Sequence, residues 1–364
     1  MKKVYEVPNE SKLQQWIDST FIVSSASDAE ELQQSAVPFT QATLYYLPGP
    51  SELVFRAHHH TVDGVGVMLF WDSFLHALSA PQTHISFCEE PARLAPAMES
   101  VLGYPPEPTP AQAEEAKDLF MSWAGSIPGI GPVSKLGTCP PGHCVNKQLS
   151  FSASQTDAIV RACKVKGFSV TSAVQAAHVL TLAQHADPRH KLSQYVTANQ
   201  FNLRRFLPMP YNSSKYAVSV YYTPLPFKID LPSSFGVIAH TLNEYYKTSY
   251  ENNAHALQLK GTFTRVLVAA VQTPEFLAAP VPRDALVSSL GIIEQYVNRT
   301  YGSLRVKDIT MGIDVIMGTS MLHIYTFHDQ LRLVYSYNNA FEEPANIQMY
   351  LEKVHGILLK ELLL

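Results

Sequence analysis

The spacing of apolar residues changes abruptly at Asp63 and Gly64, and this change constrains the fold more than any other feature of the sequence. Before it, residues 41–58 alternate, carry β-favouring side chains and contain a Pro-Gly-Pro turn at 48–50, which is typical of a hairpin. After it, apolar residues recur at helical spacing on one face, namely Val65, Met68, Trp71, Phe74, Leu75 and Leu78. The sequence therefore predicts a strand, a tight turn and a helix whose apolar face packs into a core.

Length and charge narrow the class of protein. The chain has 364 residues, which suits two domains or two lobes better than one small core. Its formal net charge is -4 and no basic face stands out, so we expect no nucleic-acid partner. No apolar run reaches the roughly 18 residues of a membrane span, and the N-terminus lacks the apolar region of a signal peptide. We expect a soluble, cytoplasmic monomer with no membrane partner.

The cysteines are too few and too scattered for a disulfide scaffold: Cys88, Cys139, Cys144 and Cys163. Cys139 and Cys144 enclose His143, but no second pair stands at the spacing of a zinc site. A loop rich in proline and glycine is the better interpretation of this segment. The sequence thus predicts no metal ion.

Residues 103–147 hold many of the prolines and glycines around a helical stretch at 111–123, and we interpret them as a crossover between two lobes. This places an N-terminal lobe at 1–150 and a C-terminal lobe at 151–364.

Gly167 is an expected helix end, and Ser172 with Gln175 an expected capping box. Strands and helices are mixed in both halves, so the predicted fold class is α/β with mixed sheets. In the second half we expect helices through 159–163 and 174–182, at about 234–249 and from Pro344 onward, and strands at 194–202, 216–222, 303–309, 322–328 and 331–337.

His59 and Asp63 are the residues of the opening turn best suited to chemistry. A histidine at the end of a strand can present a neutral imidazole that takes a proton from an alcohol, amine or thiol. Three roles are open to Asp63, which can cap the helix, pair with an arginine or orient His59. A metal site made of His58, His60 and Asp63 is disfavoured, because neighbouring residues on a strand point to opposite faces. The sequence contains neither a Gly-rich phosphate loop nor a G-x-S-x-G elbow.

The segment Phe55–Gly66 reads F-R-A-H-H-H-T-V-D-G-V-G and resembles the H-H-x-x-x-D-G motif of the CoA-dependent acyltransferase superfamily. That superfamily includes chloramphenicol acetyltransferase, plant BAHD acyltransferases and peptide-synthetase condensation domains. The segment is most similar to its counterpart in fungal O-acetyltransferases of the trichothecene type. Three further segments resemble family motifs in the same order: Asn202–Pro208 the N-x-R segment, Val306–Gly312 the place of D-F-G-W-G, and residues 325–338 the C-terminal strand pair. The similarity runs from about residue 16 to the end of the chain.

The resemblance implies two lobes similar to chloramphenicol acetyltransferase, with an active-site tunnel between them. It implies that His59 is the general base and that the acceptor attacks the thioester directly, without an acyl-enzyme. Asp63, followed by Gly64 of the motif, then has a structural role and pairs with an arginine, most simply Arg204. The residues kept from D-F-G-W-G, Asp308 and Gly312, imply a structural turn remote from the chemistry. Candidates by location for an oxyanion or substrate contact are Ser320, Tyr325, Ser336 and Asn338.

The predicted function is an acyl-CoA-dependent O-acyltransferase of fungal secondary metabolite biosynthesis. Acetyl-CoA is the expected co-substrate, no cofactor is expected to be bound, and the acceptor is expected to be a small hydroxylated natural product. Two alternatives stay open, namely a condensation or cyclisation catalyst with a carrier-bound substrate and a non-catalytic binding protein of the same fold. Family members usually carry several dozen more residues before the similar part, so we expect a shortened N-terminal lobe.

Overall fold

The computed structural model describes residues 8–34, 40–81, 94–105, 107–189, 193–249, 254–279, 281–315 and 318–364. The chain forms two compact units that are interleaved along the sequence. The first unit consists of Met1–Gly103, Asn202–Tyr222 and Glu294–Lys307, and the second of Tyr104–Phe201, Thr223–Ile293 and Asp308–Leu364. Both units contain helices and sheets, which confirms the predicted α/β class. These units are defined by compactness and not by the lobes of a family, so the lobe boundary at residue 150 stays a prediction.

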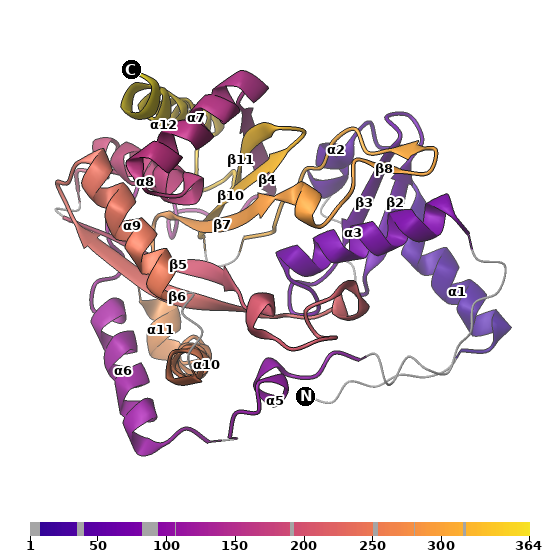
Figure 1. Ribbon diagram of the computed structural model, residues 1–364, viewed down its shortest axis with the longest axis horizontal. Helices are drawn as coiled ribbons and strands as arrows, with labels where there is room; N and C mark the ends of the chain where they lie inside the picture. Colours follow the sequence, from indigo (N-terminus) through magenta and orange to yellow (C-terminus); the bar gives the residue numbers. More distant parts are fainter. Residues whose placement is uncertain are drawn as a thin grey trace. The chain divides into compact units, whose positions relative to one another are not determined.

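A three-stranded sheet in the order β1-β2-β3 lies in the first unit (Figure 1). β1 runs parallel to β2, and β2 with β3 forms the predicted antiparallel hairpin. The predicted helix after the hairpin is confirmed as α3. The elements of this unit are α1 (Glu10–Thr20), β1 (Phe21–Val23), α2 (Ala29–Gln34), β2 (Thr43–Leu47), β3 (Glu52–Arg56), α3 (Gly64–Ser79), α5 (Met98–Val101), the 3-10 turns η1 (Arg204–Phe206), η2 (Ser214–Tyr216) and η3 (Ile293–Gln295, whose first residue belongs to the second unit), β8 (Thr300–Tyr301) and β9 (Leu304–Arg305).

A four-stranded sheet in the order β4-β11-β10-β7 forms the centre of the second unit. β11 is antiparallel to both β10 and β4, whereas β7 is parallel to β10. Helices α7, α8 and α12 pack together and against this sheet, and their apolar faces share one core with it (Figure 1). The elements of this unit are α6 (Pro110–Ala124), β4 (Cys144–Ser150), α7 (Ala153–Lys166), α8 (Val170–Gln184), β5 (Gln194–Asn202, whose last residue belongs to the first unit), β6 (Tyr222–Asp230, whose first residue belongs to the first unit), α9 (Phe235–Ser249), α10 (Ala254–Ala270), α11 (Pro274–Ala278), β7 (Ala285–Ile292), β10 (Ser320–Phe327), β11 (Gln330–Asn338) and α12 (Pro344–Leu363).

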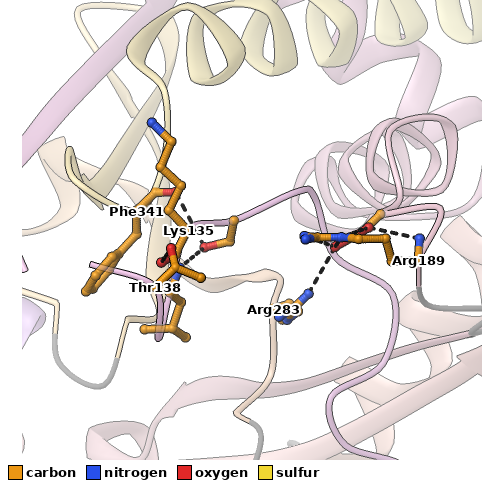
Figure 2. Close-up of polar contacts among 8 residues, drawn as sticks. Lys135, Thr138, Arg189, Arg283 and Phe341 are labelled. Atoms are coloured by element: carbon orange, nitrogen blue, oxygen red, sulfur yellow. Dashed lines mark hydrogen bonds and ion pairs between the residues drawn. The ribbon is translucent and has the colours of Figure 1, made fainter. Parts of the chain in front are cut away.

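The predicted crossover contains α6 and then a stretch without regular structure that backbone hydrogen bonds hold in place. The N–H of Ile130 donates to the carbonyl of Gln194 at 2.7 Å, and the N–H of Lys135 donates to that of Phe341 at 2.9 Å. Thr138 donates to the Lys135 carbonyl through its N–H and its hydroxyl, which closes a turn (Figure 2). The segment is therefore a packed part of the second unit.

Three local predictions are wrong. Helix α8 is capped by Ser169 and not by Ser172, because Gly167 ends α7 in a left-handed conformation and the chain turns into the next helix at once. The predicted strand at 216–222 is absent, and β6 begins only at Tyr222, since the N–H of Tyr221 is bound to a side-chain carboxylate. The predicted strand at 303–309 is reduced to β9. Helix α10 and strand β7 lie where no element was predicted.

Hydrophobic helices long enough to cross a membrane are not found in the part of the chain that the structure describes.

Candidate active site

The three histidines occupy the turn between β3 and α3, and their rings form two separate groups. The His58 carbonyl accepts hydrogen bonds from the N–H of Thr61 at 2.9 Å and from its hydroxyl at 2.6 Å, which closes the turn. His58 and His60 stack on each other, with ring centroids 5.2 Å apart. His59 instead makes an edge contact with Tyr222, with centroids 5.6 Å apart and planes at 84°. The turn thus sets His59 apart from its two neighbours.

Asp63 is buried and ties the turn to a distant segment of the same unit. Its Oδ1 accepts the N–H of Gly66 at 2.8 Å and so caps α3. Its Oδ2 accepts the N–H of Tyr221 at 2.7 Å, and its own N–H donates to the Ser219 carbonyl at 3.1 Å. Both oxygens also accept hydrogen bonds from Arg204. The structure therefore gives Asp63 two of its three open roles, the helix cap and the arginine partner.

Arg204 completes this buried network. Its Nη1 lies 2.7 Å and 2.8 Å from the two carboxylate oxygens of Asp63, and its Nη2 donates to the Ser219 hydroxyl at 2.9 Å. The guanidinium lies over the Tyr221 ring, 5.4 Å from its centroid. The Asn202 side chain accepts the N–H of Arg204 at 3.1 Å, which explains the N-x-R spacing. With both charges buried, loss of either partner would leave the other uncompensated.

Gly66 shows why the turn carries a second glycine. A Cβ on this residue would lie 2.3 Å from the Ala217 carbonyl oxygen and 2.9 Å from Cγ2 of Val62. A larger residue would push the 217–221 segment away from Asp63. The D-G-x-G spacing is the sequence signal for this close approach. Gly64, the glycine placed in the site, is the first residue of α3.

The tyrosines around the Asp63–Arg204 pair are electrically neutral near neutral pH. Burial raises the pKa of Tyr221 to about 12, and Arg204 only partly opposes this effect. Burial also raises the pKa of Tyr222, with a smaller contribution from the Asp63 charge. Burial raises the pKa of Tyr296 as well. These phenols therefore do not compete with an imidazole as proton acceptors.

Asp308 belongs to a different group, in the second unit. It pairs with Arg332 of β11 and accepts the N–H of Ile309 at 2.7 Å. The hydroxyl of Tyr325 donates to the Ile309 carbonyl at 2.9 Å. Gly312 follows in an exposed stretch without regular structure. The contacts of Asp308 are those of a local turn, and the motif role of Gly312 stays a prediction.

The four residues considered for an oxyanion contact lie in β10 and β11 and are buried. The hydroxyl of Tyr325 is bound to Ile309, and that of Ser336 donates to the Asn146 side chain at 2.7 Å. The Asn338 amide group binds the backbone of Gly142, with its Nδ2 3.1 Å from the carbonyl oxygen. Ser320 begins β10. Tyr325, Ser336 and Asn338 thus already have partners, and an oxyanion role for any of the four stays a prediction.

Metal-ligating side chains do not gather anywhere in the described ranges, which contain no group of three or more histidine, cysteine or acidic residues able to hold an ion. The thiols of Cys139, Cys144 and Cys163 are free, and Cys88 lies outside the described residues.

A family model and two curated relatives support an acetyltransferase. The model of the alcohol acetyltransferase family matches residues 134–313, just under half of the chain. An acetyltransferase of Monascus ruber, pigO, is 27% identical over 371 residues, covering 98% of this chain and 80% of that protein. The azaphilone biosynthesis cluster protein M of Aspergillus terreus is 27% identical over 319 residues, covering 83% of this chain and 76% of that protein.

The fold has a close counterpart among solved structures. The TRI3 trichothecene 15-O-acetyltransferase of Fusarium sporotrichioides superimposes with a TM-score of 0.82 at 16% identity, covering 96% of this chain and 78% of that one. At this identity the likeness concerns the fold alone, and it agrees with the chloramphenicol acetyltransferase-like architecture that the motifs imply. The family match and the relatives support an O-acetyltransferase similar to the alcohol acetyltransferases, and the shared fold agrees with this class.

Proposed function

We propose that the chain transfers an acetyl group from acetyl-CoA to a hydroxyl group of a small natural product, with His59 as the general base. The observation that carries this proposal is the placement of His59. Of the three histidine rings in the turn, His58 and His60 stack on each other, whereas His59 lies against the segment that Asp63 holds. An imidazole on an anchored turn is well placed to take a proton from a bound alcohol.

The reaction needs one base and no covalent intermediate on the protein. The neutral His59 imidazole takes the hydroxyl proton as the acceptor oxygen attacks the thioester carbonyl carbon. The carbon–sulfur bond then breaks, and the CoA sulfur takes the proton from the imidazolium. An acetate ester and free CoA leave, and His59 is neutral again, so proton and charge balance over one cycle.

The relatives support the acceptor class. The matching family is that of alcohol acetyltransferases, and one relative is named after an azaphilone biosynthesis cluster. The protein of similar fold acetylates an oxygen of a trichothecene, according to its name. A hydroxylated secondary metabolite is the acceptor that these descriptions share.

The test combines product identification with histidine variants. Purified protein, acetyl-CoA and an extract of the producing organism are incubated, and products that have gained one acetyl group are identified by mass spectrometry. We expect His59→Ala to lower this acetyl transfer by about 100-fold or more. Its urea unfolding midpoint should stay unchanged, because the side chain is exposed.

His60→Ala is the matched control, since His60 is exposed in the same turn, and it should keep the wild-type rate. Full activity of His59→Ala would remove His59 as the base. Transfer from a carrier-bound thioester but not from free acetyl-CoA would favour a condensation-type catalyst instead.

A further inference from the structure

We propose that Tyr222 is a positioning residue that holds the His59 imidazole in its working orientation. This inference rests on the proposed function of His59 as the base. It assigns a role to a residue outside the H-H-x-x-x-D-G and N-x-R motifs.

The first reason is the weak support that His59 has otherwise. The residue is exposed and lies in a turn, where an imidazole can rotate about two side-chain bonds. Within the described ranges, no hydrogen bond reaches its ring, and its aromatic contact is with Tyr222. A base must point toward the proton that it removes, so a free ring would spend much of its time misdirected. The separation of 5.6 Å and the angle of 84° fit the favourable edge-to-face arrangement of two rings.

The second reason is that the position of Tyr222 is itself fixed. Tyr222 is the first residue of β6 and is half-buried. Just before it, the N–H of Tyr221 is bound to Asp63 at 2.7 Å, and the carbonyl of Tyr221 accepts the N–H of Leu203 at 2.8 Å. Asp63 stands four residues after His59 and caps α3. Both sides of the His59–Tyr222 contact are therefore anchored to the same carboxylate.

The third reason is that the two rings are in contact, whereas no hydrogen bond joins the Tyr222 hydroxyl to His59 in the described ranges. The geometry is that of two rings in contact. Burial raises the pKa of the phenol, which keeps it uncharged where His59 would act. Phenylalanine should therefore replace Tyr222, whereas an aliphatic side chain should not.

The experiment compares Tyr222→Phe with Tyr222→Leu in the full chain and has two readouts. The first is the NMR signal of the His59 ring, assigned among the 14 histidines by its absence in His59→Gln. The second is the rate of CoA release from acetyl-CoA with the acceptor extract. We expect Tyr222→Leu to shift the His59 signal and to lower turnover about tenfold, with an apparent KM for acetyl-CoA within about twofold of wild type. Tyr222→Phe should keep the wild-type signal and rate.

The outcomes separate the two proposals. An inactive His59→Ala beside a Tyr222→Leu with unchanged signal and turnover would overturn the role of Tyr222 and leave the base intact. An active His59→Ala would refute the base, whatever the Tyr222 variants do. Equal losses in Tyr222→Phe and Tyr222→Leu would assign the effect to the hydroxyl and overturn the ring contact. Tyr222→Met, with a side chain of similar reach, takes the place of Tyr222→Leu if that variant fails to fold.

Discussion

Two buried aspartates, Asp63 in the first unit and Asp284 in the second, meet the cost of burial in opposite ways. Asp63 is 4% exposed and Asp284 only 1%. The Asp63 carboxylate is surrounded by donors, since Arg204 and two backbone N–H groups bind it. Within the described part of the chain, neither oxygen of Asp284 accepts a hydrogen bond. The surroundings of Asp63 thus stabilise a charged carboxylate, whereas those of Asp284 do not.

The surroundings of Asp284 show that a neighbour in sequence need not become a partner in space. The adjacent Arg283 donates to Asp187 at 3.4 Å, and Arg189 binds the same carboxylate at 2.7 Å (Figure 2). Burial raises the pKa of Asp284 to about 6. The hydroxyls of Thr197 and Tyr195 lie near enough to oppose this shift, although not at hydrogen-bonding geometry. A buried carboxyl without an arginine thus becomes a weaker acid, whereas Asp63 organises three chain segments through its charge.

Replacing Arg204 should have the largest effect, because the bond to this arginine is what distinguishes the buried Asp63 carboxylate from that of Asp284. Arg204→Met fills a similar volume but leaves the Asp63 carboxylate buried without its cation. We expect a loss of about 3–5 kcal/mol in the free energy of unfolding, measured by urea denaturation. Arg205→Met is the matched control, since Arg205 is exposed, and it should change stability by no more than about 0.5 kcal/mol. Equal losses in the two variants would contradict a special role for the buried pair.

Replacing Asp284 should act in the opposite direction at high pH. Its pKa is raised from an ordinary 3.8 to about 6 in the folded protein. The protonated form therefore stabilises the fold below about pH 4, and this contribution is lost as the pH rises through about 6. A shift of this size corresponds to about 3 kcal/mol. Asp284→Asn, which cannot ionise, should match wild type near pH 4 and exceed its stability at pH 8.

Urea denaturation of both proteins at several pH values checks this expectation. Burial raises the pKa of Glu342 to about 7, which gives wild type and variant the same additional slope with pH. The difference between the two curves therefore reports Asp284 alone. A difference that does not change between pH 4 and pH 8 would show that Asp284 keeps its ordinary pKa.

The same contrast explains how much could be predicted from the sequence. The hairpin and α3 follow from local periodicity, so residues 41–79 were predictable as a strand pair, a turn and a helix. Asp63 and Arg204 are far apart in the sequence, so local patterns could not predict that they pair. Only the resemblance to the family motifs implied it. The contact of Tyr222 with His59 could not be predicted, since it depends on the Asp63 carboxylate accepting the N–H of Tyr221 in place of a neighbouring strand. The shifted pKa of Asp284 was equally hidden, because it reflects what the surrounding core fails to supply.

A third aspartate, Asp308, is exposed, and its replacement should give the smallest loss of stability. It also pairs with an arginine, Arg332, but its side chain is 57% exposed while that of Arg332 is only 6% exposed. Water screens such a pair, so its charge contributes little. Asp308→Asn removes the charge and keeps an oxygen for the N–H of Ile309, and we expect a loss of about 1 kcal/mol or less. The exposed Asp314 of the same stretch supplies the control variant Asp314→Asn, and urea denaturation at low and high salt is the measurement. Because salt screens exposed charges, the difference in stability between the two variants should shrink in high salt. If Asp308→Asn instead loses as much free energy of unfolding as Arg204→Met, burial of one partner is enough to make such a pair important for stability.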